Sequence, residues 1–422
     1  MSQSESEFHG RASLAGYRAA LNTPGSRRPV VASLLARLPI AMIGMSVLLF
    51  VQRETGSFAT AGVVSASTLA GVSFGSVLQG RLIDRFGPTR PLLTVSAIFA
   101  ALIAALVTAI EMHAPTALLV PLAAGIGLSE PMTGSASRAL WSRLLPPGPA
   151  RNAAFSYEAI SMETFFILGP GLAGLLITTP WPGTGVVLGA ACMVTGSALF
   201  ALSPAVRAWG PAPAAHRRLL GALANPGMRT LALAALGFGM VIGFVEVAVP
   251  AAAAEAGHLA VGGLLLSLWS VSSVGFGVAY SLRPWPRPMG LRLPALLVAF
   301  GGLVALLALP STLWVLGAAM LAAGALITPQ SATHSAAIEI VAPKGTAAEA
   351  FGWVLTAITF GLACGQSVSG YLVEHSGPAT AFLVAGACAT VLAAAVWLLR
   401  GTIRPAPDAT GTGARVTAAG QR

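Results

Sequence analysis

Long apolar stretches alternate with short polar connections along almost the whole chain. An apolar run of about 20 residues is long enough to cross the roughly 30 Å hydrocarbon core of a bilayer as one helix. Twelve stretches meet this criterion, and the pattern therefore predicts an all-α membrane protein with twelve spans, at residues 30–51, 58–79, 91–110, 115–137, 153–177, 184–204, 230–253, 259–281, 293–309, 312–337, 350–372 and 378–399.

The composition supports this interpretation. Hydrophobic residues make up 55% of the 422 residues and charged residues only 9%, and the mean hydropathy is +0.78. A soluble domain of this size carries roughly a quarter charged residues. We therefore expect a polytopic protein that has the lipid bilayer as its surroundings.

The formal net charge of +10 is explained by topology rather than by nucleic-acid binding. If the N-terminus is cytoplasmic, every Arg and Lys except Arg37 and Arg53 falls in a cytoplasmic segment, as the positive-inside rule requires for an even number of helices. The sequence thus predicts a plasma-membrane protein with both termini in the cytoplasm, and no nucleic-acid partner.

An internal repeat divides the chain into two halves. Three segments recur in order, at offsets of 202, 196 and 196 residues: Ala20–Arg27 as Ala222–Arg229, Ser135–Arg138 as Ser331–His334, and Ala154–Gly174 as Ala350–Gly370. Duplicated halves are common in secondary transporters. We expect an N-terminal tail (1–28), a six-helix bundle (29–204), a cytoplasmic linker (205–228), a second six-helix bundle in the same orientation (229–400) and a disordered cytoplasmic tail (401–422).

A charged hairpin between the second and third apolar stretches carries a motif. Gly80, Asp84, Arg85 and Gly87 form the pattern Gly-x-x-x-Asp-Arg-x-Gly, and Arg90 follows as a base. Because a charged segment cannot lie in hydrocarbon, we expect the chain to leave the membrane here, with bends at the two glycines. The motif resembles the loop signature of the major facilitator superfamily of secondary transporters.

This resemblance implies a function for the loop and a fold for the chain. It implies that residue Asp84 holds the cytoplasmic side closed, by pairing with nearby bases and facing a helix N-terminus, which favours an anion. It also implies the major facilitator fold: two pseudo-symmetric six-helix bundles with the substrate site between them near the bilayer midplane. Pro88 and Thr89 stand where the family usually carries Arg or Lys.

The fifth span shows a second likeness. Gly169, Pro170 and Gly174 resemble the antiporter motif of proton-coupled drug exporters, in which small residues permit close helix packing and the proline permits a bend. Ordinary tight packing explains the same residues equally well. The fourth span has Pro121 where the exporters carry a characteristic Arg.

Ionisable residues inside the spans are the candidates for substrate binding and proton coupling, because each costs about 3 kcal/mol or more at the bilayer centre unless it faces a cavity or a partner. Arg37, Glu130 and Glu163 lie at comparable depth in the first half, and Glu246 lies in the second half without an obvious basic partner. Burial disfavours the charged form of a carboxylate, and a buried carboxylate is therefore suited to carry a proton. The alternative is a static ion pair that fixes helix packing.

A further ion pair is predicted near the cytoplasmic side, between Arg138 at the end of the fourth span and Glu158 in the fifth. Such a pair would either lock the two helices together or close an inner gate.

Enzymatic chemistry is not expected, and neither is a cofactor or a metal. The segment Gly71–Gly75 spells Gly-x-Ser-x-Gly but lies inside an apolar helix without a preceding strand, and no Walker A sequence occurs. The sequence predicts a monomeric transporter that moves a small molecule together with protons, by efflux of an amphipathic compound. The alternative is proton-coupled uptake of a small anion, with Arg37 as its charge clamp.

Overall fold

The structure is a computed structural model that describes residue 18 and residues 21–146, 149–210, 222–281, 288–342 and 347–404. Most of the predicted N-terminal tail (1–28) and C-terminal tail (401–422), and residues 211–221 of the predicted linker (205–228), lie outside these residues. Within the described ranges the chain forms helices and no strand. The α-helices are α2 (Arg27–Thr55), α3 (Phe58–Phe86), α4 (Thr89–Glu111), α5 (Thr116–Ser129), α6 (Thr133–Leu144), α7 (Pro149–Leu176), α8 (Thr184–Ala201), α9 (Pro204–Arg207), α10 (Pro226–Glu255), α11 (Leu259–Ser281), α12 (Met289–Ala305), α13 (Leu313–Gly324), α14 (Ile327–Val341) and α15 (Ala347–Leu398).

The predicted fold class is confirmed. Eleven helical segments are long and apolar enough to cross a membrane. The last of them, Ala350–Leu398, contains two crossings, because the backbone at Gly377 leaves the helical conformation with φ 81° and ψ 166°. The chain therefore crosses the bilayer twelve times, as the apolar stretches predict.

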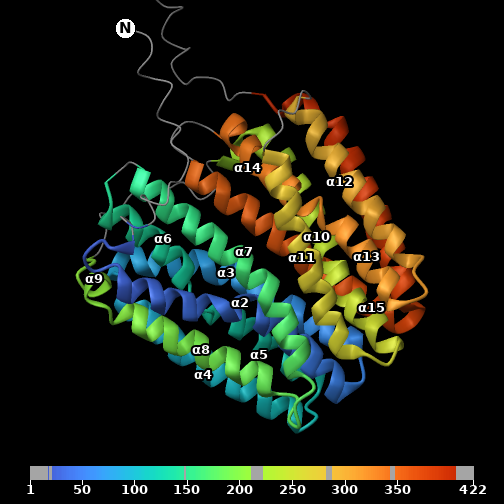
Figure 1. Cartoon of the computed structure of the whole chain (residues 1–422), viewed down its shortest axis with the longest axis horizontal. Coiled ribbons are helices and arrows are strands. Elements are labelled where there is room, and N and C mark those ends of the chain that lie inside the picture. The colour runs from blue at the N-terminus through green and yellow to red at the C-terminus, as the bar shows by residue number, and fades with distance from the viewer. Residues whose placement is uncertain are drawn as a thin grey trace, which may run out of the picture.

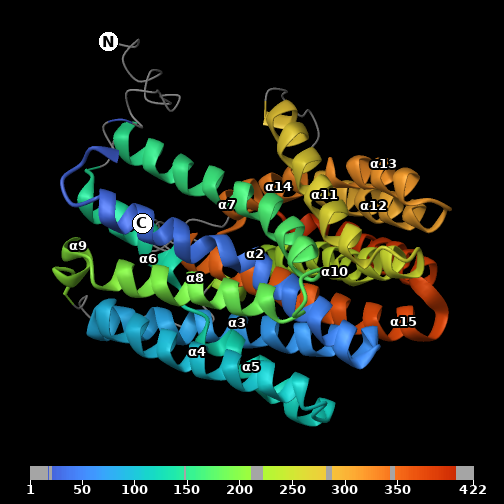
Figure 2. The ribbon, with the colours of Figure 1, turned by 60° about the horizontal axis from the view of Figure 1, so that its bottom comes forward.

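The crossings form two six-helix bundles, an N-terminal half (α2 to α8) and a C-terminal half (α10 to α15). In two views, α4, α5 and α8 gather on one side of the molecule and α12 and α13 on the other (Figures 1 and 2). The fourth and tenth crossings are both interrupted, between α5 and α6 and between α13 and α14. These interruptions lie at equivalent positions of the sequence repeat, so the two halves share their internal architecture.

The charged hairpin is shorter than the sequence analysis predicts. Helix α3 continues through Gly80 as far as Phe86, and α4 starts at Thr89. Gly87 makes the turn with a φ of 76°, which favours glycine, and Pro88 follows it. The expected bend at Gly80 is therefore wrong: the apolar pattern ends where the helix leaves hydrocarbon, whereas the helix itself ends only at the first glycine with a positive φ.

Two ends of the molecule can be named from their turns. The Gly56 end contains the α2–α3 connection, and the Gly87 end contains the α3–α4 connection. At the Gly56 end, glycines bring the two halves into close contact: a Cβ atom on Gly62 would lie 2.6 Å from the carbonyl oxygen of Gln366, and one on Gly174 would lie 2.4 Å from that of Ala260. Any side chain larger than hydrogen would force these helices apart.

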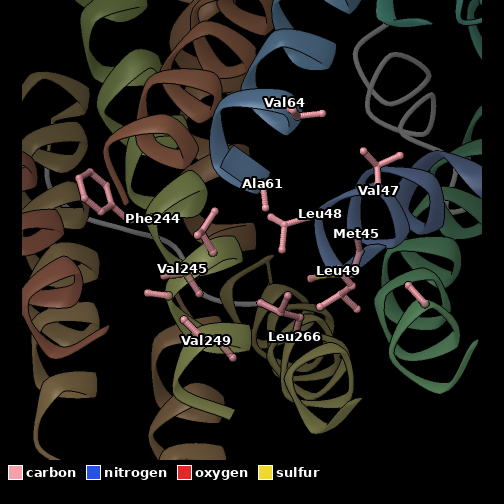
Figure 3. Close-up of a cluster of buried hydrophobic side chains, with 14 of the residues drawn as sticks. Met45, Val47, Leu48, Leu49, Ala61, Val64, Phe244, Val245, Val249 and Leu266 are labelled. Carbon is pink, nitrogen blue, oxygen red and sulfur yellow. The ribbon is translucent and has the colours of Figure 1, made fainter. Parts of the chain in front are cut away.

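The largest apolar cluster lies at the same end and belongs to both halves. Figure 3 shows side chains of α2 and α3 beside those of α10 and α11, with Leu48, Leu49 and Ala61 near Val245 and Leu266. The remaining apolar clusters, which lie toward the Gly87 end, each draw their buried residues from one half alone. The hydrophobic contact between the halves is thus concentrated at the Gly56 end.

Toward the Gly87 end the halves separate. Helices α7 and α11 approach each other at Gly174 and Gly263 and diverge toward their other ends (Figure 2). Gly80 on α3 and Gly352 on α15 have no heavy atom within 4 Å of an added Cβ. The described part of the chain is therefore closed at the Gly56 end and open at the Gly87 end.

Candidate functional site

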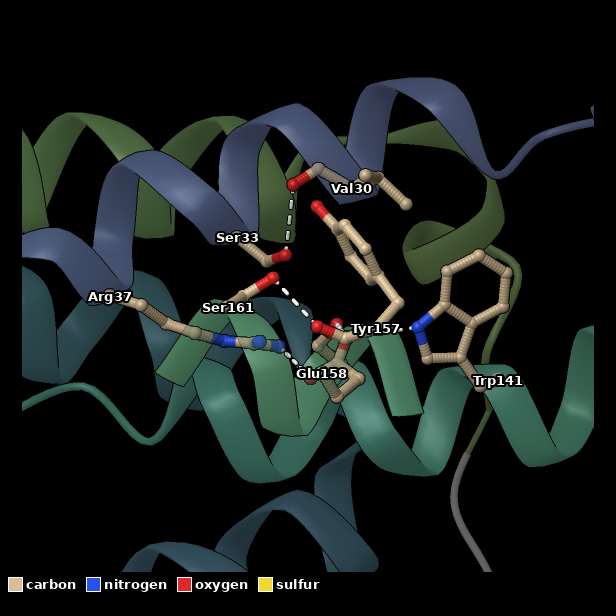
Figure 4. A network of polar contacts seen from close by, with 8 residues as sticks. Val30, Ser33, Arg37, Trp141, Tyr157, Glu158 and Ser161 are labelled. Atoms are coloured by element: carbon tan, nitrogen blue, oxygen red, sulfur yellow. Dashed lines mark hydrogen bonds and ion pairs between the residues drawn. The ribbon is translucent and has the colours of Figure 1, made fainter. Parts of the chain in front are cut away.

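A buried ion pair crosses the N-terminal half. The Nη2 atom of Arg37 on α2 donates to Oε2 of Glu158 on α7, and both side chains are almost fully buried (Figure 4). The other carboxylate oxygen accepts from Ser137 Oγ at 2.8 Å and from Trp141 Nε1 at 2.9 Å, both on α6. The pair thus ties the first, fourth and fifth crossings together.

This geometry corrects the predicted partner of Glu158. The sequence predicts Arg138 as this partner, but Arg138 is exposed and forms no ion pair among the described residues. Ser137 and Trp141 share one face of α6 and both donate to Glu158, whereas Arg138 forms no hydrogen bond with it among the described residues. Arg37 supplies the charge from α2, a contact that spacing along the chain does not reveal.

The ion pair bears on the two interpretations of Arg37. Its guanidinium is bound by a carboxylate whose two oxygens are both occupied, inside a buried network. Breaking such a pair leaves an uncompensated buried charge. In this structure Arg37 is therefore engaged in an ion pair, with Glu158 as its partner rather than Glu130 or Glu163.

Glu130 lies at the interruption of the fourth crossing. Helix α5 ends at Ser129, Glu130 adopts an extended conformation (φ −60°, ψ 119°), and Pro131 follows. A residue before proline is driven out of the helical region, and proline itself lacks the N–H that would continue the ladder. The Glu130 side chain is half-buried and has no ionic partner in the described part of the chain.

Gln79 on α3 closes this interruption, and the sequence analysis misses it. Its Nε2 donates to the carbonyls of Leu128 (3.0 Å) and Glu130 (2.8 Å), and its Oε1 accepts from the backbone N–H of Met132 (3.1 Å). Gln79 is 1% exposed. The available signal is a lone amide in an otherwise apolar span, opposite a span that contains a Glu-Pro pair.

Glu246 on α10 pairs with an amide rather than a base. Gln366 Nε2 on α15 donates to Glu246 Oε2 at 2.6 Å, whereas Gln366 Oε1 is buried without a partner. This pair lies directly behind the contact between the halves, because the carbonyl of Gln366 faces Gly62. Among the described residues Glu246 forms no ion pair.

The remaining candidates of α7 are spread over different surfaces. Glu163 is exposed, Gly169 packs against Ala41 in the same half, and Gly174 packs against Gly263 in the other half. Pro170 adjoins that second contact through its carbonyl oxygen, which lies 2.2 Å from a Cβ placed on Gly263. Close packing by small residues thus occurs at both glycines, but only Gly174 and Pro170 face the opposite bundle.

The charged groups of the two ends differ. At the Gly87 end, Arg85 and Arg90 are exposed, and the side chain of Asp84 lies outside the described atoms. At the Gly56 end, the carboxylate of Glu374 on α15 accepts from Ser57 Oγ and from the backbone N–H of Ala59 (2.9 Å). A carboxylate of one half therefore caps the N-terminus of a helix in the other, where the helix dipole favours an anion.

Three solved structures share this architecture at low sequence identity. A mutant of the nucleoside transporter NupG superposes with a TM-score of 0.74 and 17% identity, covering 89% of this chain and 99% of that one. The peptide transporter POT in complex with sulfate superposes with a TM-score of 0.68 and 15% identity, covering 93% of this chain and 99% of that one. A bacterial homologue of the human lysosomal transporter Spinster, in an inward-facing and unoccupied conformation, superposes with a TM-score of 0.68 and 14% identity. The match covers 94% of this chain and 100% of that one.

These likenesses establish the fold, and all three neighbours are transporters rather than enzymes. No curated protein sequence matches the chain. A family model, that of the Major Facilitator Superfamily, matches residues 30–348, which is most of the chain. The protein is thus a membrane transporter and belongs to the major facilitator superfamily.

Proposed function

We propose that the protein couples the movement of its substrate to protons through Glu130, and that it exports amphipathic compounds. The observation that carries the coupling is the place of Glu130, a carboxylate without a basic partner at an interruption of a membrane-spanning helix. Burial without a partner disfavours the charged form of a carboxylate, so a carboxylate in these surroundings is suited to bind a proton and release it.

Glu246 is the second candidate for a proton. A neutral carboxylic acid there would donate its O–H to the unpartnered Oε1 of Gln366 while still accepting from Nε2, so that the acid and the amide exchange two hydrogen bonds. Glu163, which is exposed on α7, ranks after both because an exposed carboxylate can keep its charge solvated.

The choice of an amphipathic substrate rests on Arg37. Uptake of a small anion needs a free cation to clamp it, and Arg37 is the one Arg or Lys among the described residues that is fully buried. Since Glu158 already neutralises it, the anion alternative loses its clamp. The partial antiporter motif at Gly169, Pro170 and Gly174 points the same way.

Alternating access would use the glycines of α3 and α15 at both ends of the molecule. Gly62 meets Gly370 at the closed end, and Gly80 and Gly352 lie 18 residues further along the two helices toward the open end. Eighteen residues are five helical turns, so Gly80 and Gly352 share a face with the contacting glycines. We propose that they meet when the Gly87 end closes, with Asp84, Arg85, Gly87 and Arg90 forming the gate there.

The membrane orientation follows from the charges. With the basic residues inside, we propose that the Gly87 end is cytoplasmic, and that the protein is an inward-open transporter of the plasma membrane with both termini in the cytoplasm. The bundle boundaries at 29–204 and 229–400, the linker between them and the monomeric state belong to the same proposal.

A liposome assay tests the proposed substrate class. Purified protein is reconstituted into liposomes that carry a pH gradient and a pH-sensitive dye, and amphipathic cations, neutral amphiphiles and small carboxylates are added in turn. We expect amphiphiles to dissipate the gradient in the presence of protein, and not in protein-free liposomes. Dissipation by carboxylates alone would contradict export of amphiphiles and would favour the anion alternative.

A further inference from the structure

The interruption of the fourth crossing leaves backbone groups that the helices do not satisfy. Because Glu130 is extended, the carbonyl of Leu128 loses its helical partner, the N–H of Met132, and Pro131 has no N–H to donate in its place. Within hydrocarbon no water replaces that partner. Leu128, Glu130 and Met132 therefore each present a backbone group that needs a side chain.

One amide meets all three needs. Gln79 donates one hydrogen bond to the carbonyl oxygen of Leu128 and one to that of Glu130, and it accepts one from the N–H of Met132. A carboxylate of the same length cannot donate, and an apolar side chain can do neither. Glutamine matches the requirement because its amide carries both kinds of group.

Close packing of α3 on α5 brings the amide within reach. Added Cβ atoms on Gly71 and Gly75 would lie 2.1 Å from the carbonyl oxygen of Ala124 and 2.5 Å from that of Leu128, and one on Gly127 would lie 1.8 Å from that of Thr68. The backbones of the two helices are therefore in contact along the two turns of α3 that precede Gln79.

The equivalent interruption in the C-terminal half does without such an amide. There the backbone N–H of Leu326 bonds Ala323 O at 3.2 Å, and that of Gln330 bonds Leu326 O at 3.0 Å, so backbone bonds continue across the gap. The residue at the repeat position of Glu130 is Leu326. The carboxylate is thus missing from its place in the other half, where backbone bonds span the interruption.

We infer that Gln79 is a positioning residue for Glu130: by binding the backbone on both sides of Pro131, it fixes the direction in which the Glu130 carboxylate leaves the interruption. The inference rests on the proposed coupling role of Glu130. Without the amide, the segment Leu128–Met132 takes up other conformations to satisfy its carbonyls, and the carboxylate moves with it.

The test compares Gln79→Met with Gln330→Met in lipid nanodiscs. Gln330 is an equally buried glutamine of the tenth crossing whose amide has no partner in the described residues, so its replacement controls for the loss of a buried amide. Hydrogen exchange of peptides covering residues 128–136 reports the interruption. The infrared carboxyl band that Glu130→Gln removes, followed against pH, reports Glu130.

We expect exchange of that segment to be about tenfold faster in Gln79→Met, which corresponds to a loss of about 1.4 kcal/mol, and the Glu130 band to shift in frequency and in titration. Gln330→Met should change neither. If Gln79→Met does not fold, Gln79→Glu, which keeps the acceptor for Met132, serves in its place.

Faster exchange with an unchanged Glu130 band would reduce Gln79 to a structural residue, and unchanged exchange would overturn the inference altogether. If Glu130→Gln removes no band at any pH, the coupling role of Glu130 fails. The exchange measurement then decides by itself whether Gln79 holds the interruption.

Discussion

Replacement of Glu130 by Gln should abolish transport driven by a pH gradient and spare substrate exchange at equal pH on both sides. An exchanger must return with a proton at the site that the substrate vacates, and a glutamine cannot change its charge. Flux driven by a pH gradient in reconstituted liposomes should fall to the level of protein-free liposomes, because no other carboxylate lies at the interruption of a described crossing.

Glu255→Gln is the matched control, since Glu255 ends α10 and is exposed at the Gly56 end. It should retain pH-driven flux. Full pH-driven flux in Glu130→Gln would remove Glu130 from the coupling mechanism, and Glu246→Gln and then Glu163→Gln would become the variants to measure.

Replacement of Arg37 by Ala destabilises the folded protein by about 3–5 kcal/mol, because it leaves the buried carboxylate of Glu158 without its counter-charge. Glu158→Leu alone should have a comparable effect by leaving Arg37 unpaired. The double variant Arg37→Met with Glu158→Leu should recover much of the loss, because no buried charge remains. Thermal unfolding of the purified protein, followed by size-exclusion chromatography, measures all three.

Arg138→Ala provides the control for this series. Its side chain is exposed, so we expect the melting temperature to stay close to that of the unaltered protein. A loss of stability in Arg138→Ala as large as that in Arg37→Ala would contradict the ion pair and restore Arg138 as the partner of Glu158.

The architecture was predictable because it depends on properties that repeat over many residues. The length of an apolar run decides whether a helix crosses the bilayer, and the repeat linking Gly174 to Gly370 is visible in the sequence. In the structure both glycines contact the opposite half, so the pseudo-symmetry of the chain is expressed in the contact that joins its halves.

The candidate site was less predictable because it depends on which helix faces which. The pairing of Arg37 with Glu158 joins residues 121 positions apart, and nothing along the chain distinguishes it from a pairing with Arg138. Gly80 was expected at a bend because the apolar pattern ends there, although a helix continues readily into polar surroundings. Pro131 was visible in the fourth span, but its consequence depends on the opposing Gln79.

The central claim is that the two halves rock between contact at the Gly56 end and contact at the Gly87 end. Disulfide cross-linking of the pair Gly80→Cys and Gly352→Cys tests it most directly. Among the described residues, no heavy atom of another element lies within 4 Å of a Cβ added at either position, so the pair cannot bridge unless the Gly87 end closes. The native cysteines Cys192, Cys364 and Cys388 are first replaced by Ser.

We expect an oxidant to cross-link this pair in membranes. The control pair combines Gly80→Cys with Gly302→Cys, which lies on α12 away from the contact between the halves, and it should stay unlinked. Because a disulfide needs Cα atoms within about 7 Å, the cross-link requires a close approach of α3 and α15 that this structure lacks. Failure of the Gly80–Gly352 pair to cross-link, in protein that remains folded and in the membrane, would contradict the account.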